Sequence, residues 1–238
     1  MRPPRFVEQF WSVSWDLRGQ GPFDSTVITF PSLHITHEWG DDGPRHGFPL
    51  PNTLVHGVVG RVFHTTISER GRVVGARFRP GGFTARFGRD ATALRGRVQP
   101  VDNELFGGPI HLDDDVDAAS ARLDELVGDY AGELDPTYVS LTQLVDRIRD
   151  DDRLHRVEQV MQHSPWSART TQRVFRRYVG CRSSGCCAAT AYSRQHWRSI
   201  ATLASTSPTS PSASAGTTRH TSSTTSAPCW AVLRAVMP

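Results

Sequence analysis

The stretch WSVSWDL, residues 11–17, alternates apolar and polar side chains at every second position. Because successive side chains of a strand point to opposite faces of a sheet, this period of two predicts a β-strand. The same alternation recurs in TVITF at residues 26–30 and in LHITHEW at residues 33–39. Turn-forming clusters such as GDDG (40–43) and PLPN (49–52) separate the runs. We therefore expect an antiparallel barrel or sandwich over residues 1–110.

Two further extended runs lie at residues 60–67 (GRVFHTTI) and 72–79 (RVVGARFR), with SERG between them. This arrangement predicts a β-hairpin. The triplet Pro80, Gly81 and Gly82 is expected to end the second strand, because proline cannot donate a hydrogen bond to a ladder and paired glycines favour a sharp reversal.

After Pro109 the apolar period changes from that of strands to that of helices. Three aspartates at residues 113–115 precede a first helix, where their charge suits the positive end of the helix dipole. Its apolar residues are Val116, Leu123, Leu126 and Val127. Asp135 and Pro136 supply an N-cap and a first-turn proline for a second helix. Its apolar stripe is Val139, Leu141, Leu144, Val145 and Ile148. We place a domain boundary here, between a β-rich regulatory domain with a packed helix (1–134) and a helical module (135–180).

Two shorter helices are expected within that module, at residues 154–162 and 168–178, separated by Ser164, Pro165 and Trp166. Val157, Val160 and Met161 would face inward on the first of them, and Ser167 would cap the second. The second helix has an apolar stripe at helical spacing, formed by Thr171, Val174, Phe175 and Tyr178. Its remaining surface carries Arg169, Gln172, Arg173, Arg176 and Arg177.

Two short helices joined by a tight turn, with Arg and Gln outward on the second, meet the requirements of a helix-turn-helix. Arg can pair with guanine, Gln with adenine, and the remaining Arg with phosphates. We expect Trp166, Val174 and Phe175 to hold this helix in place. The alternative is a basic helix face that is simply solvated.

The segments RVEQV (156–160) and SARTTQRVFRRYVG (167–180) together resemble the first helix-turn-helix of AraC/XylS-type transcriptional regulators. The segments WSVSWDLRG (11–19) and GARFRPGGF (75–83) are similar to the β-rich regulatory domain that precedes it in an actinobacterial-style subgroup. The resemblance implies an α+β fold and a cytoplasmic transcription factor with no catalytic activity. It also implies partners: double-stranded promoter or operator DNA, a possible small-molecule effector and a possible homodimer. In that family two helix-turn-helix units are bridged by a long helix and contact adjacent major-groove segments.

The chain departs from the family pattern in two ways. Pro165 stands where the family's turn usually has glycine, so a positive-φ turn is not available to it. The bridging helix and the second helix-turn-helix are missing after Gly180. Losing half of the DNA contacts predicts weak operator binding by this chain.

The tail, residues 181–238, contains none of the chain's 24 acidic residues but all four of its cysteines. Back-translating residues 206–231 with plausible GC-rich codons and a one-base shift gives DLADLAVRLGWYDQAHFIHDFRSVLG, whose second half resembles the family's second recognition helix. We therefore interpret the tail as disordered and frameshifted, and call the chain read in the shifted frame the frame-restored chain. The alternative is a genuine low-complexity tail.

Charge and cysteine usage limit the other interpretations. Residues 1–180 carry 22 Arg against 24 acids, and the tail adds five Arg to give the net charge of +3. The overall basic charge is therefore no indication of nucleic-acid binding. The cysteine-free first 180 residues offer no disulfide framework. The sequence shows no apolar stretch long enough to cross a membrane and no signal-peptide core, so we expect a soluble protein that does not bind membranes.

Several local patterns suggest chemistry that we do not favour. On a strand, His34, Thr36 and Glu38 share one face while His37 points to the other, so only two candidate metal ligands converge. We expect neither a metal nor a cofactor, and interpret this strand as structural or as part of an effector pocket. Arg77 and Arg79 beside the glycine pair suggest an anion-binding nest, but exposed arginines at a strand end are the simpler interpretation.

The sequence also lacks signs of catalysis. The pair Cys186 and Cys187 is attributed to the shifted frame rather than to metal or redox chemistry. No nucleophile elbow, Walker-type loop or zinc signature is present. A small β-barrel enzyme is therefore not favoured. The main alternative to a regulator is an effector-binding or dimerising β domain without DNA-binding activity.

Overall fold

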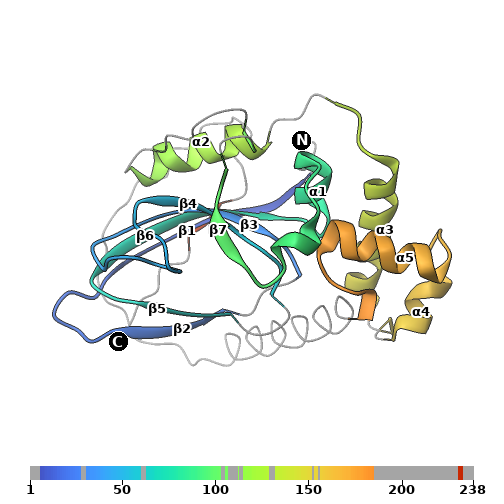
Figure 1. The fold of residues 1–238 in the computed structure, drawn as a ribbon, viewed down its shortest axis with the longest axis horizontal. Helices are drawn as coiled ribbons and strands as arrows, with labels where there is room; N and C mark the ends of the chain where they lie inside the picture. Colours follow the sequence, from blue (N-terminus) through green and yellow to red (C-terminus); the bar gives the residue numbers. More distant parts are fainter. Residues whose placement is uncertain are drawn as a thin grey trace, which may run out of the picture.

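The computed structural model describes residues 6–27, 31–59, 63–102, 105–106, 112, 115–128, 132–151, 153–154, 156–184 and 230–232. These residues form an α+β fold (Figure 1). The strands are β1 (Val7–Asp16), β2 (Phe23–Val27), β3 (His34–Gly40), β4 (Asn52–His56), β5 (Phe63–Ile67), β6 (Arg70–Phe78), β7 (Val98–Pro100) and β8 (Trp230–Val232). The helices are α1 (Gly82–Phe87), η1 (Ala91–Leu94), α2 (Val116–Gly128), α3 (Pro136–Asp150), α4 (Val157–Gln162), α5 (Ala168–Val174) and η2 (Phe175–Val179).

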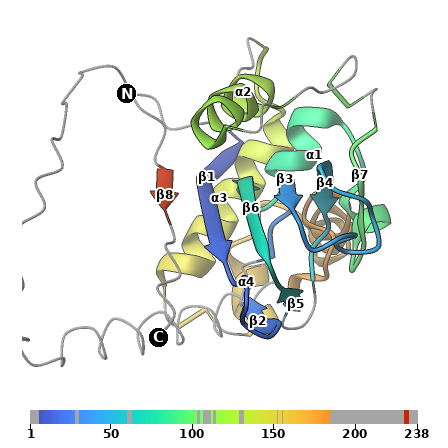
Figure 2. The same cartoon turned by 90° about the vertical axis from the view of Figure 1, so that its left-hand side faces the viewer.

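The described strands form two sheets. The main sheet has six strands in the order β7-β4-β3-β6-β1-β8, and β2 pairs with β5 in a separate sheet. From β7 to β1 all neighbours are antiparallel, as predicted. Helix α2 lies along one face of the main sheet, β2 and β5 lie along the other, and α3, α4 and α5 gather at one end (Figures 1 and 2).

Strand β1 confirms the alternation that WSVSWDL predicts. Phe10 and Ser12 are buried on the face that α2 covers, whereas Trp11 and Trp15 point toward β2 and β5. Two glycines of the neighbouring strand β6 make room for these indoles. A Cβ at Gly75 would lie 2.5 Å from the Trp11 ring, and one at Gly71 would lie 2.3 Å from the Trp15 ring. These cross-strand pairs help to fix the register of β1 against β6.

The predicted hairpin between residues 60–67 and 72–79 is wrong as a strand pair. Strand β5 pairs with β2, while β6 pairs with β1 and β3, so the two strands belong to different sheets. The turn between them includes Glu69, whose φ is +48°, and the Glu69 carbonyl accepts a hydrogen bond of 2.6 Å from the Leu17 amide. This hydrogen bond lies next to the Asp16–Arg70 pair, where the β1–β6 ladder ends. Residues 28–30 and 60–62, at the edges of the predicted strands, lie outside the described residues.

The triplet Pro80, Gly81 and Gly82 ends β6 as predicted. Gly81 has φ of +86° and forms the N-cap of α1. Helix α1 itself was not predicted from the sequence. A side chain at Gly82 would lie 2.3 Å from the Phe6 carbonyl oxygen. Glycine is therefore required at both positions, for backbone conformation at the first and for close approach at the second.

Helices α2 and α3 begin where the sequence predicts. The Asp115 carboxylate accepts hydrogen bonds of 3.0 Å from the amides of Asp117 and Ala118, and Asp135 accepts one of 2.8 Å from Thr137. Residues 113 and 114 lie outside the described residues. The apolar stripe of α3 is confirmed except at its start, where Tyr138 rather than Val139 is buried.

Helices α4 and α5 also occupy the predicted region. Helix α4 starts at Val157, later than expected, and buries Val160. Helix α5 continues into a π-helical turn, η2, and ends at Gly180, whose φ is +80°. Within the described part of the chain, no helix combines the length and apolar composition that crossing a lipid bilayer requires.

The hydrophobic core is continuous across the predicted boundary at residue 135. One cluster contains Phe10 and Ile35 from the sheet together with Leu141 and Phe175 from the helices. Arg79 also forms a 2.9 Å ion pair with Asp146 of α3. The division into domains therefore stays a prediction, with the helical segment packed directly on the β part.

The tail is not wholly without structure. Cys181 is 7% exposed and Ser183 is 2% exposed, and Cys181 belongs to the core cluster. Residues 230–232 form β8, which pairs in parallel with β1 at the edge of the main sheet (Figure 2). The disorder of residues 181–238 stays a prediction. Cys186, Cys187 and the rest of the tail lie outside the described residues.

Candidate functional site

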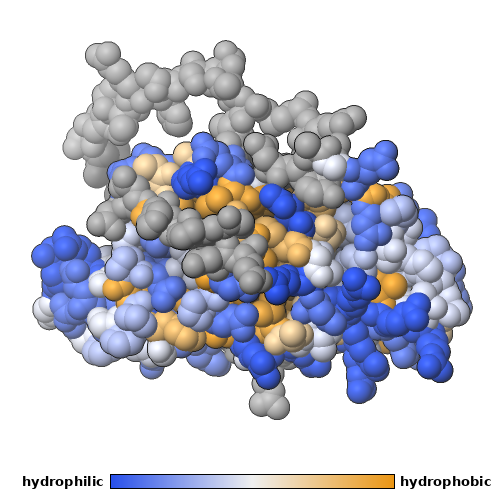
Figure 3. All heavy atoms as spheres, turned by 45° about the horizontal axis from the view of Figure 1, so that its top comes forward, coloured by the Kyte–Doolittle hydropathy of each residue, from blue (hydrophilic) through white to orange (hydrophobic). Residues whose placement is uncertain are grey.

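The five side chains predicted to contact DNA are all exposed on α5 and η2. They are Arg169, Gln172, Arg173, Arg176 and Arg177. The opposite side of the same helix is buried, with Thr171 and Phe175 at 0% exposure. Hydrophilic residues cover most of the end of the molecule where α4 and α5 lie, on the right of Figure 3. The helical period thus correctly separates the inward and outward faces.

Hydrogen bonds from short polar side chains hold the turn before α5. The Ser167 hydroxyl caps the helix by accepting from the Thr170 amide at 3.3 Å. The Ser164 hydroxyl accepts from the Trp166 amide at 3.2 Å and lies 2.7 Å from the Thr171 hydroxyl. No residue of this turn has a positive φ, as expected with Pro165 in place of glycine. Trp166, Val174 and Phe175 pack against the core, which confirms their predicted positions.

The C-terminal end of the exposed helix is fastened to the β part. The Thr92 hydroxyl donates to the Arg176 carbonyl at 2.8 Å, and the Thr84 hydroxyl donates to the Tyr178 carbonyl at 3.2 Å. The Tyr178 hydroxyl donates to the Asp135 carboxylate. Burial raises the pKa of Tyr178, and the hydrogen bond to Asp135 raises it further. The tyrosine therefore stays neutral and keeps its proton for this bond.

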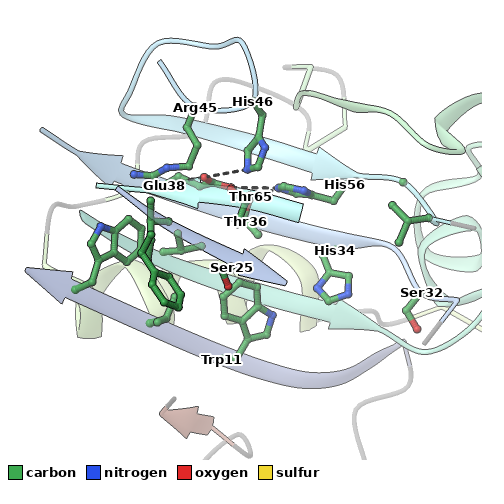
Figure 4. A pocket seen from close by; sticks show the side chains of 17 residues that line it. Trp11, Ser25, Ser32, His34, Thr36, Glu38, Arg45, His46, His56 and Thr65 are labelled. Carbon is green, nitrogen blue, oxygen red and sulfur yellow. Dashed lines mark hydrogen bonds and ion pairs between the residues drawn. The ribbon is translucent and has the colours of Figure 1, made fainter. Parts of the chain in front are cut away.

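A cavity of about 240 Å³ lies between the main sheet and the β2–β5 sheet (Figure 4). Strand β1 contributes Trp11, Val13 and Trp15 to its wall, and β3 contributes His34, Thr36 and Glu38. Indole and aliphatic groups supply most of the surface, and polar groups concentrate around Glu38. A mainly apolar pocket with a few convergent polar groups is typical of small-molecule sites.

The polar groups around Glu38 form one network. The two carboxylate oxygens of Glu38 face different partners: Oε1 lies 3.2 Å from His56 Nε2, and Oε2 lies 3.6 Å from His46 Nε2. Arg45 approaches Oε2 at 3.3 Å, and the Thr36 hydroxyl donates to Oε1 at 2.8 Å. Glu38 is 2% exposed, so these partners replace the water that a buried carboxylate loses.

The face assignment of LHITHEW is confirmed, and β3 supplies one residue, Glu38, to a cluster of possible metal ligands. His34, Thr36 and Glu38 line the cavity, whereas His37 lies on the other face and contacts the Thr53 hydroxyl at 2.6 Å. The cluster of possible ligands is nevertheless three residues, Glu38, His46 and His56. His46 and His56 could not be found from LHITHEW, because they lie in a turn and in β4, and β4 was not predicted.

Burial and the network together set the charge of these groups. Burial alone raises the pKa of Glu38, but the hydrogen bond from His56 and the effects of His46 and Thr36 outweigh it and lower that pKa to about 2. Burial lowers the pKa of His46 from its usual 6.5, against an opposing effect of Glu38. Glu38 is therefore an anion at neutral pH and His46 is mostly a neutral base.

Burial also lowers the pKa of His34, to about 3, with His56 and Arg77 adding to the effect. In the unfolded chain this histidine binds a proton below about pH 6.5, which the folded residue does not. The folded state should therefore lose stability as the pH falls from about 6.5 toward 3. Between about pH 6.5 and 4.5 we expect His34 to account for about 2 kcal/mol of this loss, at about 1.4 kcal/mol per pKa unit.

Urea unfolding of wild type and His34→Gln across this pH range measures that contribution. The variant should show the shallower decline in unfolding free energy, whereas His64→Gln, an exposed histidine on β5, should follow wild type. Equal slopes for all three proteins would show that His34 does not have the lowered pKa.

Three polar atoms of the cavity residues have no hydrogen-bond partner within the described part of the chain. They are Trp11 Nε1, Ser32 Oγ and His34 Nε2. Leaving a buried polar group unsatisfied costs about 1–3 kcal/mol. The cavity is thus suited to a small molecule that has hydrogen-bonding groups as well as an apolar body.

The suggested anion nest at the end of β6 is not supported. Arg77 pairs with Glu8 at 3.6 Å and Arg79 pairs with Asp146 at 2.9 Å. Both side chains are also half-buried rather than fully exposed at the strand end. These arginines fasten β6 to β1 and α3.

Fold and site together define an α+β protein in which an antiparallel β part contains a mainly apolar cavity with a polar cluster in its wall and carries a helix with an exposed basic face. Residues 4–100 match the profile of a family described as a domain of unknown function, DUF6597. The match extends from β1 to β7 and includes every residue described above as lining the cavity. Neither the curated proteins nor the solved structures contain a match to the chain.

Proposed function

We propose that the protein is a sequence-specific DNA-binding regulator of AraC type, in which α5 enters the major groove and the β domain binds a small effector. The observation that carries the proposal is the division of α5 and its continuation η2 into a buried apolar stripe and an exposed face of four Arg and one Gln. The helix is capped by Ser167, and its Arg and Gln side chains are exposed to solvent. These features meet the requirements for contacting base edges.

Position along the helix assigns roles to the individual side chains. In helix-turn-helix proteins the N-terminal residues of the second helix contact base edges. Arg169, Gln172 and Arg173 lie in this part and are assigned to bases. Arg176 and Arg177 follow in η2, whose backbone is held by Thr84 and Thr92, and are assigned to phosphates.

The cavity supports the effector part of the proposal. The profile match covers residues 4–100, the part of the chain that contains the cavity. A physical connection also joins the cavity to the helix. Gly57 lines the cavity and packs so closely on η1 that a Cβ there would lie 1.6 Å from the Leu94 carbonyl oxygen, and η1 in turn contacts η2 through Thr92.

Substitution of Arg173 tests the DNA-binding role. A well-placed bidentate contact to a base contributes about 1–3 kcal/mol, so Arg173→Ala should weaken binding by about 5- to 150-fold. The measurement is a gel shift with the frame-restored chain on duplexes selected from a library randomised over about 20 base pairs, two turns of DNA. Arg122→Ala on α2, which also removes an exposed arginine, is the matched control and should bind as wild type.

The cavity favours one alternative: a ligand-binding or dimerising β domain without DNA-binding activity. The two functions predict different results for the same pair of variants. Equal DNA affinity for Arg173→Ala and Arg122→Ala, or selection of no preferred duplex, would contradict the regulator and leave this alternative.

A further inference from the structure

We propose that Glu38, His46 and His56 bind a divalent transition-metal ion at the wall of the cavity. The site lies in the β part and does not depend on whether α5 binds DNA. Two imidazoles and one carboxylate are a donor set that Zn²⁺ and Fe²⁺ use in proteins.

The distances between the three side chains suit a shared ion. Two ligand atoms bound to one ion at about 2.1 Å each are at most about 4.2 Å apart. Glu38 approaches the two imidazoles with different oxygens, Oε1 at 3.2 Å from His56 Nε2 and Oε2 at 3.6 Å from His46 Nε2, so a carboxylate that binds through both oxygens keeps both pairs within this limit. All three ligand atoms lie within 4.8 Å of one another, so small side-chain rotations would complete the set.

The charges near the cluster leave a net negative charge for a cation. Arg45 is the main competitor, since its guanidinium lies 3.3 Å from Glu38 Oε2. The same guanidinium is closer to Asp42, at 2.9 Å. It also lies over the Trp15 ring, with its central carbon 4.7 Å from the ring centroid. Two carboxylates therefore share one guanidinium, and Oε1 of Glu38 faces away from Arg45 toward His56.

The backbone at His46 places its ring in the network. His46 has φ of +54° and Gly47 has φ of +85°, between the bridged residues Arg45 and Phe48. Two successive positive φ values are typical of a type I′ turn, where Asn-Gly is preferred. At this position the turn directs the imidazole of His46 toward Glu38 (Figure 4), which gives a reason for histidine in place of the preferred asparagine.

The remaining coordination positions would face the cavity. Glu38, His46 and His56 all line it, so a water molecule or the donor atom of a bound small molecule can complete the coordination. A zinc site with three protein ligands and an open position is of this kind. The ion would then anchor a cavity ligand that carries an oxygen or nitrogen donor.

Metal titration of the full chain tests the proposal. After dialysis against EDTA, Zn²⁺ binding is measured by isothermal titration calorimetry and Co²⁺ binding by its visible absorption. We expect one ion per chain, bound through nitrogen and oxygen and without a thiolate charge-transfer band. Loss of an outer partner of a metal site costs about 10- to 100-fold in affinity, so Glu38→Gln, His56→Ala and His46→Asn should each cost at least about 100-fold.

Two controls keep the test specific. His46→Asn preserves a residue that tolerates positive φ, so its circular dichroism and melting should match wild type while metal binding is lost. His64→Ala removes an exposed histidine outside the cluster and should bind the ion normally. Absence of binding by wild type, unchanged affinity in His46→Asn, or a thiolate band from the cysteines of the tail would each overturn the proposal.

Discussion

Restoring the reading frame after Gly180 is expected to raise the affinity for a specific duplex by about 30-fold to several thousand-fold. Specific binding of a regulator exceeds its non-specific binding by about 4–10 kcal/mol. If the second helix-turn-helix supplies half of that, its loss removes about 2–5 kcal/mol, which corresponds to this range. On the proposed function, the outer face of α5 is the surface of the described residues that supplies direct base contacts.

Gel shifts at about 0.15 M salt compare the printed chain, the frame-restored chain and a chain ending at Gly180. The salt concentration is important because the five arginines of the tail add non-specific attraction to phosphates at low ionic strength. The chain ending at Gly180 should bind as weakly as the printed chain, which would separate missing contacts from interference by the tail. Equal affinity of the printed and frame-restored chains would contradict the frameshift hypothesis.

Local sequence pattern was sufficient for β1, α2, α3 and α5, each of which buries one face. The alternation of WSVSWDL, the aspartate caps at 115 and 135, and the spacing of Thr171, Val174 and Phe175 all predict positions that the structure confirms. In each case the burial of one face or the satisfaction of a backbone amide depends on residues close in sequence.

Strand pairing could not be obtained in the same way. The turn between β5 and β6 has the length of a hairpin, yet the partners are chosen by distant residues. The indoles of Trp11 and Trp15 fit over Gly75 and Gly71, and this fixes β6 beside β1. A short turn therefore gives the order of strands along the chain but not their neighbours in a sheet.

The polar cluster of the cavity could not be predicted from local sequence either, because its members are distant from one another along the chain. Glu38 was singled out in LHITHEW, but its partners His46 and His56 are 8 and 18 residues further along the chain. One available signal was the His-Gly pair at residues 46–47, where a two-residue turn places a histidine at positive φ. The other was the apolar run around Leu54 and Val55, which forms the strand that aligns His56 with His34.

Replacing Phe175 by alanine should cost about 3–5 kcal/mol of unfolding free energy, a large part of the about 5–15 kcal/mol that holds a typical domain together. Phe175 is completely buried between α5 and the core, so its removal leaves a cavity beneath the exposed helix. Arg173→Ala, two residues earlier on the outer face, should change the unfolding free energy by no more than about 0.5 kcal/mol.

Urea denaturation of both variants, paired with gel shifts of the same proteins, separates folding from recognition. Phe175→Ala should lose stability and, with it, the rigid placement of α5. Its DNA affinity should therefore fall because the fold is destabilised. Arg173→Ala should lose affinity at unchanged stability, because its side chain contacts nothing in the core. The opposite pattern, a stable Phe175→Ala and a destabilised Arg173→Ala, would mean that the helix presents its other face to solvent. No basic surface would then be available for the major groove.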